Sequence, residues 1–117
     1  MSINEPLTTE NKSGIRVVYL PEMAIDAASA NGLKERMAPV LEADSRVVLE
    51  FSRVRFVDSA GLGCILGFLR TLQQKGGELK VCGLSKSVRS LFEMVRFHRV
   101  VEIFPDVDES VRAFEKA

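Results

Sequence analysis

The sequence has few of the side chains on which catalysis and metal binding usually depend. It contains one histidine, His98, and two cysteines, Cys64 and Cys82. The acidic residues are scattered and His98 has no second histidine to pair with, so we expect neither a metal site nor a cofactor. Both cysteines lie in apolar segments without metal-ligand spacing, which is typical of buried free thiols in a reducing cytosol. We therefore expect a cytoplasmic protein.

An excess of charge and a long hydrophobic run are also missing. Lys and Arg together number 16, as do Asp and Glu, so the net charge is zero. This argues against nucleic acid as the main partner, because phosphate backbones attract a basic excess. No apolar run approaches the roughly 20 residues of a membrane span. Residues 1–6 have neither a basic nor an apolar region of the kind found in signal peptides, so none is expected.

Fingerprints of nucleotide-binding enzymes and serine hydrolases are absent as well. The Walker pattern and Gly-x-Gly-x-x-Gly do not occur, and Gly61-x-Gly63 is too short to replace them. Val57 stands where a Gly-x-Ser-x-Gly elbow around Ser59 would need its first glycine. We expect His98 to lie two elements away from Ser59, too far to serve as its base. The sequence therefore predicts a binding protein rather than an enzyme.

Hydrophobic periodicity divides the 117 residues into strands and helices of a single domain. The first dozen residues are polar and are expected to be loose or to form a short edge strand within 3–9. The predicted strands are 15–20, 46–51, 78–84 and 100–104. The predicted helices are 26–43, 59–75, one capped by Ser85 and carrying His98 near its end, and one capped by Asp106 or Asp108.

The order of these elements favours an α/β fold. From residue 46 onward it is β-α-β-α-β-α, which gives parallel strands with right-handed crossovers. We expect a mixed, mostly parallel sheet of about four or five strands with about four helices. Val54 and Phe56 should extend the strand 46–51. Asp26 should cap the helix 26–43, and Pro39 should kink or break it, because proline removes a hydrogen bond and clashes one turn back.

The most informative segment runs from Phe56 to Gly63, where a predicted strand meets a predicted helix at Ser59. A helix start offers free backbone N–H groups and a positive dipole end, which tolerate negative charge. Ser59 can be a phosphate acceptor or an ordinary helix cap, and the residue types leave both open. A phosphate would add about −1.5 to −2 charge units and could switch binding without disturbing the fold. Gly61, Gly63 and Gly67 would let this helix approach its sheet or a partner closely.

Two stretches, Val47–Gly63 with its Asp58-Ser59-Ala60-Gly61-Leu62-Gly63 end and Gly76–Met94, resemble the STAS domain family, as in bacterial anti-sigma factor antagonists. The resemblance implies a small α/β fold and a serine, matching Ser59, that an anti-sigma factor kinase phosphorylates. The unmodified protein would bind that kinase and free a sigma factor, and a PP2C-type phosphatase would restore the serine. Asp58 would orient the Ser59 hydroxyl or cap the helix. The residues expected at the partner surface are Asp26, Asp58, Ser59, Ala60, Gly61, Leu62 and Gly63.

Two segments depart from the family pattern. Met23-Ala24-Ile25-Asp26 stands where the family usually carries Gly-x-Leu/Ile-Asp, so Asp26 matches and the glycine is missing. Val95-Arg96-Phe97-His98 is bulkier and more basic than the small residues that often end the family's third helix. An alternative role is a STAS subunit of a transporter or lipid-trafficking complex, in which the serine patch docks a partner without phosphate chemistry. The sequence leaves the oligomeric state open.

Overall fold

A five-stranded sheet forms the centre of the protein, which we describe from a computed structural model for residues 6–115. Its strand order is β1-β2-β4-β6-β7. These strands are Thr8–Lys12 (β1), Ile15–Tyr19 (β2), Arg46–Glu50 (β4), Glu78–Cys82 (β6) and Glu102–Phe104 (β7). β1 is antiparallel to β2, and the other neighbours are parallel. The predicted mixed, mostly parallel sheet is confirmed.

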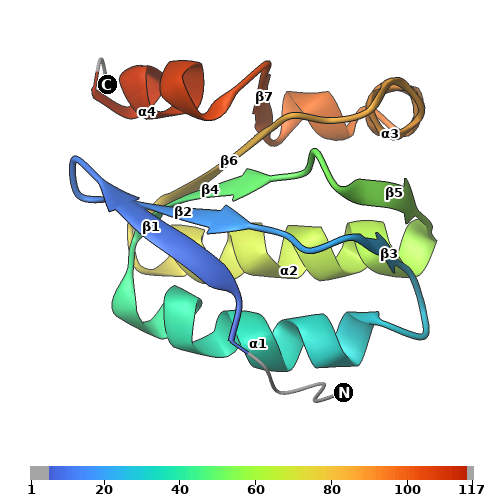
Figure 1. The fold of residues 1–117 in the computed structure, drawn as a ribbon, viewed down its shortest axis with the longest axis horizontal. Helices are drawn as coiled ribbons and strands as arrows, with labels where there is room; N and C mark the ends of the chain where they lie inside the picture. Colours follow the sequence, from blue (N-terminus) through green and yellow to red (C-terminus); the bar gives the residue numbers. More distant parts are fainter. Residues whose placement is uncertain (1–5, 116–117) are drawn as a thin grey trace.

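Helices cover both faces of this sheet (Figure 1). α1 (Ala30–Ala43) and α2 (Ser59–Gln74) lie on one face, and α4 (Val107–Glu115) lies on the other. α3 (Lys86–Met94) packs against the strand β5, described below. The main core fills the space between the sheet and the pair α1 and α2, and a smaller core lies under α4. The predicted α/β class is therefore confirmed.

A second, two-stranded sheet corrects one prediction. β3 (Met23–Ile25) and β5 (Val54–Val57) pair in parallel and stand apart from the larger sheet. Val54 and Phe56 were expected to extend the strand 46–51, but a turn after Phe51, closed by a 2.9 Å bond from the Val54 N–H to the Phe51 carbonyl, starts a new strand. Ile25 pairs with Val57 at the ends of these two strands. Asp26 and Asp58, which follow them in the chain, therefore start from neighbouring strand ends.

The start of the chain also differs from the prediction. The edge strand is Thr8–Lys12, held by β2, and not a strand within 3–9. Residues 3–5 of that expected strand lie outside the described residues.

The first helix is shorter than predicted and is not interrupted at Pro39. α1 begins at Ala30, so Asp26 is not its N-cap. The helix continues through Pro39 to Ala43, and the expected break is wrong. Pro39 and Glu35 are both exposed, and on the solvent side of a helix water can reach the Glu35 carbonyl, which has no proline N–H to bond.

The predicted ends of the later helices are largely confirmed. Ser85 caps α3 by accepting from the Val88 N–H at 3.2 Å, and Asp106 accepts from the Glu109 N–H at 2.9 Å. Gly76, at φ +76, ends α2 in the left-handed conformation that glycine adopts easily. His98 is not on α3, because Arg96 at φ +61 ends that helix and the turn η1 (Phe97–Arg99) follows.

Phe92 holds α3 to the main core. Its ring is fully buried and lies 6.0 Å from the Phe51 ring and 5.1 Å from the Phe97 ring, edge to face in both cases. We expect Phe92→Ala to lower the free energy of unfolding by about 3–5 kcal/mol, because it leaves a cavity in a packed core. Urea denaturation would measure this. Phe56→Ala is the matched control, since Phe56 is 54% exposed. Similar losses for both variants would contradict the assignment.

Candidate functional site

Asp58 fixes the N-terminus of α2. It is the N-cap residue, and its Oδ1 accepts from the Gly61 N–H at 2.9 Å. Its Oδ2 accepts from the Ala27 N–H at 3.3 Å, and its own N–H donates to the Ile25 carbonyl at 3.2 Å. One carboxylate therefore joins the helix start to the segment after β3. The prediction that Asp58 caps the helix is confirmed, and the alternative that Ser59 is the cap is wrong.

Asp26 shapes the loop beside Asp58. Its Oδ1 accepts from the N–H groups of Ala28 and Ser29 at 3.1 and 3.0 Å. The Ser29 hydroxyl accepts from the Asp26 N–H at 3.0 Å and donates to the Ala24 carbonyl at 2.7 Å. These short-range bonds hold the loop in one turn. Because β3 and β5 are parallel and Ile25 pairs with Val57, the turn carries Asp26 to the same end of the molecule as Asp58.

Gly61 allows the helix to lie against β3. A Cβ atom at this position would be only 2.0 Å from the Ile25 carbonyl oxygen. The predicted close approach to the sheet is thus confirmed for Gly61. Gly63 and Gly67 do not approach the sheet, because both are exposed and a Cβ at either would meet nothing within 4 Å; their close approach to a partner stays a prediction. Leu62, between them, is half-buried and packs on the main core.

Ser59 occupies the first position of α2 and is exposed. Its hydroxyl forms no hydrogen bond with another described residue, so Asp58 does not orient it, and the N–H groups of Ser59 and Ala60 donate to none of them either. Those two N–H groups belong to the set that a helix start always leaves unpaired. Together with the helix dipole they offer donors and a favourable field to a negative group beside the free hydroxyl, against which the nearby Asp58 carboxylate acts.

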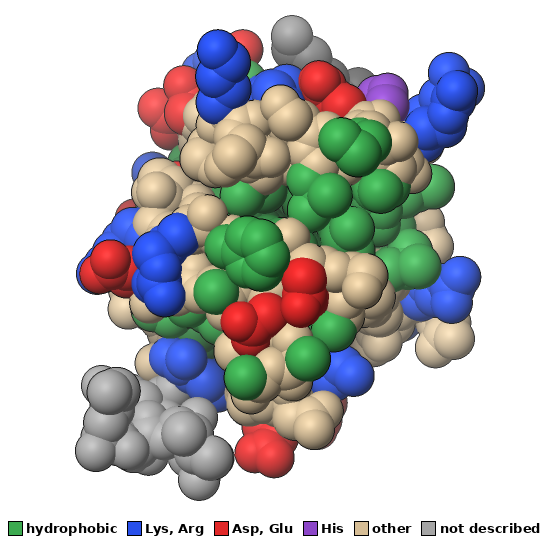
Figure 2. Space-filling view, turned by 90° about the vertical axis from the view of Figure 1, so that its right-hand side faces the viewer, with side chains coloured by type: hydrophobic (Ala, Val, Ile, Leu, Met, Phe, Trp, Pro, Cys, Tyr) green, Lys and Arg blue, Asp and Glu red, His purple; other side chains and the backbone are tan. Residues whose placement is uncertain are grey.

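Figure 2 shows the end of the molecule where β3, β5, α3 and the start of α2 meet. Acidic side chains lie near its middle, and hydrophobic side chains gather beside them. The structure brings Asp26, Asp58, Ser59, Ala60 and Gly61 together here, as the sequence predicts for a shared site. Phe56, Met94 and Val95 are also exposed and were not among the residues expected at the partner surface. For Met94 and Val95 the available signal was the bulky end of α3, where apolar residues continue past the helix.

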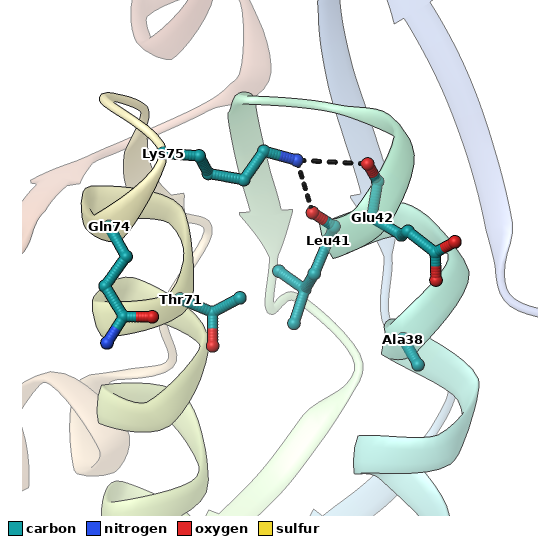
Figure 3. A pocket seen from close by; sticks show the side chains of 6 residues that line it. All are labelled: Ala38, Leu41, Glu42, Thr71, Gln74 and Lys75. Carbon is teal, nitrogen blue, oxygen red and sulfur yellow. Dashed lines mark hydrogen bonds between the residues drawn. The ribbon is translucent and has the colours of Figure 1, made fainter.

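One hollow lies far from Ser59. It has a volume of about 520 Å³ between the last turns of α1 and α2 (Figure 3). The Lys75 ammonium donates to the Leu41 and Glu42 carbonyls at 2.6 and 3.1 Å and so caps α1. Lys75 is roughly 24 Å from Ser59 along α2, at 1.5 Å per residue. This hollow therefore contributes nothing to the Ser59 site.

The other reactive side chains are also unsuited to chemistry at this site. Cys64 and Cys82 are buried free thiols, as predicted. Burial raises the pKa of both, that of Cys82 to about 11, so the reactive thiolate is scarce at neutral pH. Among residues 6–115 no group of three or more metal-ligating side chains occurs. Within the same range, none of the helices combines the length and apolar character needed to cross a membrane.

The sequence between residues 6 and 110 matches the profile of the STAS domain. The chain belongs to the STAS domain family. It is 33% identical over 105 residues to the anti-sigma-B factor antagonist of Bacillus subtilis, an alignment that covers 88% of this chain and 92% of that protein. The predicted membership of the family is confirmed.

Solved structures support the same fold. The anti-sigma factor antagonist from Mycobacterium paratuberculosis superposes with a TM-score of 0.80 at 21% identity, covering 92% of this chain and 91% of that one. The phosphorylated form of the Bacillus cell fate determinant SpoIIAA superposes with a TM-score of 0.66 at 19% identity, covering 94% and 97%. At these identities the likeness establishes the STAS fold of this chain.

The two neighbouring glycines of α2 provide a test of how the site is built. Gly61→Ala should lower the free energy of unfolding by about 1–3 kcal/mol or more, because the new methyl group collides with the Ile25 carbonyl. Gly63→Ala should raise it by about 0.5–1 kcal/mol, since the methyl group meets open space and alanine favours a helix. Urea denaturation of both variants would measure the contrast. Equal effects of the two substitutions would show that α2 does not touch β3 at Gly61.

Proposed function

We propose that this STAS protein is an anti-sigma factor antagonist whose binding is switched by phosphorylation of Ser59. The observation that carries the proposal is the division of roles between Asp58 and Ser59. Asp58 caps α2, and the exposed Ser59 hydroxyl has no structural bond to lose. The relatedness to an anti-sigma-B factor antagonist supports the class of partner.

A phosphate on Ser59 costs the fold little. The free N–H groups of Ser59 and Ala60 and the positive end of the α2 dipole face the same region and stabilise negative charge. The added charge of about −1.5 to −2 units would lie beside the Asp58 carboxylate. A partner surface in contact with this region would have to desolvate both charges, which disfavours binding. The same modification therefore leaves the domain folded and weakens its complex.

The phosphate has to be supplied and removed by other proteins. Phosphoryl transfer requires a site that holds a nucleotide and its metal ion, and the sequence has no nucleotide-binding fingerprint. We propose an anti-sigma factor with serine kinase activity as the partner of unmodified Ser59. A PP2C-type phosphatase would then restore the hydroxyl and with it the binding-competent form.

Substitutions at Ser59 separate the chemical role from the structural one. Ser59→Ala should bind the anti-sigma factor kinase with unchanged affinity and should accept no phosphate from it and ATP. Ser59→Asp should weaken binding by about tenfold or more, because a charge then lies in the interface. Calorimetry and mass spectrometry would measure the two effects.

Thr71→Asp provides the matched control for the added charge. Thr71 is exposed on the same helix, roughly 18 Å further along at 1.5 Å per residue. Thr71→Asp should leave both the affinity for the kinase and the phosphorylation of Ser59 unchanged. Phosphate on the Ser59→Ala protein in wild-type yield would contradict the site, and undiminished affinity of Ser59→Asp would contradict the switch.

A further inference from the structure

Large apolar side chains are exposed close to the Ser59 site. Met94 is 78% exposed, Phe56 54% and Val95 49%, and Leu91 beside them is half-buried. The fold itself gains nothing from leaving a methionine and a phenylalanine in water. Contiguous apolar surface of this kind in a small domain marks a place where another molecule binds.

These four residues, which we call the α3 anchor, form one continuous surface. Phe56 and Leu91 line the same hollow, of about 200 Å³. Leu91, Met94 and Val95 are spaced i, i+3 and i+4, which places them on one side of the last turn of α3. The Val95 N–H donates to the Leu91 carbonyl at 3.1 Å, so the helical geometry persists to Val95.

The α3 anchor is adjacent to the candidate site. Phe56 lies on β5 only two residues before Asp58. In Figure 2 the hydrophobic side chains and the acidic side chains of this end occupy the same face. A protein that covers Ser59 therefore lies within reach of the anchor as well.

Charge indicates which partner suits this face. Asp26 and Asp58 form no ion pair with any residue between 6 and 115. A kinase that phosphorylates Ser59 has to bring the cationic groups and metal ion that hold its nucleotide close to the Ser59 hydroxyl. Those positive charges would face the two carboxylates. The face thus combines an acidic end that complements a nucleotide site with an apolar end that can pack against the surrounding protein.

We propose that the α3 anchor, Phe56, Leu91, Met94 and Val95, docks an apolar surface of the same anti-sigma factor kinase that acts on Ser59. This inference rests on the proposed function and adds to it the source of the binding affinity. Buried apolar contacts at Met94 supply binding energy in both phosphorylation states, whereas the charge at Ser59 controls whether the complex persists. Arg96 and His98 follow the anchor directly and are exposed, so they border the same contact surface, whereas Phe97 is buried in the main core.

Met94→Asp tests the anchor. The probes are the anti-sigma factor kinases of the source organism, each purified and titrated separately by calorimetry. For the kinase that binds the wild-type protein, Met94→Asp should weaken binding by about tenfold or more. In steady-state phosphorylation the KM for this protein should rise by a similar factor, while kcat at saturation should stay unchanged, because Met94 does not touch the reacting atoms.

Val100→Asp is the matched control. Val100 is 52% exposed, almost the same as Val95, but it lines a different hollow, together with Gly77 at the far end of α2. The affinity of Val100→Asp for the kinase should match that of the wild-type protein. Val95→Thr keeps the shape of the side chain, spares the fold and should weaken binding by about threefold. If circular dichroism shows that Met94→Asp does not fold, Val95→Thr still tests the anchor.

The outcomes separate this inference from the proposed function. A wild-type protein that binds no kinase overturns both. A wild-type protein that binds and is phosphorylated on Ser59, with unchanged affinity for the Met94 and Val95 variants, overturns the anchor alone. A dimer of this chain that Met94→Asp converts to monomer in sedimentation, with kinase affinity unchanged, would show that a second copy covers the face and would also overturn the anchor.

Discussion

The close contact between Gly61 and the Ile25 carbonyl determines how the functional end of this molecule is assembled. A side chain at Gly61 would place its Cβ 2.0 Å from that oxygen, so only glycine lets α2 start against β3. Asp58 completes the junction by bonding to the Gly61 and Ala27 N–H groups. The loop that carries Asp26 is thereby held beside the helix start, and Ser59 is presented to solvent.

Much of the fold can be predicted from apolar pattern, and the parts that cannot are those decided by distant contacts. The helix over 59–75 and the strand over 46–51 have long apolar patterns, and each pattern indicates one type of secondary structure. β3 has three residues after Pro21, and its pairing with β5 depends on a turn after Phe51 that the pattern does not reveal. Pro39 was expected to kink or break α1, but the helix continues through it, and its exposed position lets water reach the freed carbonyl.

The same limit applies to the site. Asp58 and Ser59 are adjacent and both are residue types that cap helices, so sequence alone leaves open which one does. The register of β3 against β5 and the Gly61 contact place the cap at Asp58. The α3 anchor was missed for a related reason. Leu91, Met94 and Val95 follow helical spacing, which usually indicates core, and only the position of α3 at the edge of the small sheet leaves Met94 exposed.

The order of Asp58 and Ser59 matters for a phosphorylation switch, because it decides which side chain caps α2. If the serine were the cap, its hydroxyl would accept the bond that now goes to Asp58, and a kinase would have to break that bond to reach it, at a cost of about 1 kcal/mol. Modification would then act on the cap itself, at the start of α2 that lies against Ile25. With Asp58 as the cap, the bonds that hold the helix start do not involve the Ser59 side chain, whether it carries a hydroxyl or a phosphate. The change in charge is then expressed at the surface, where a partner would meet it, and not in the fold.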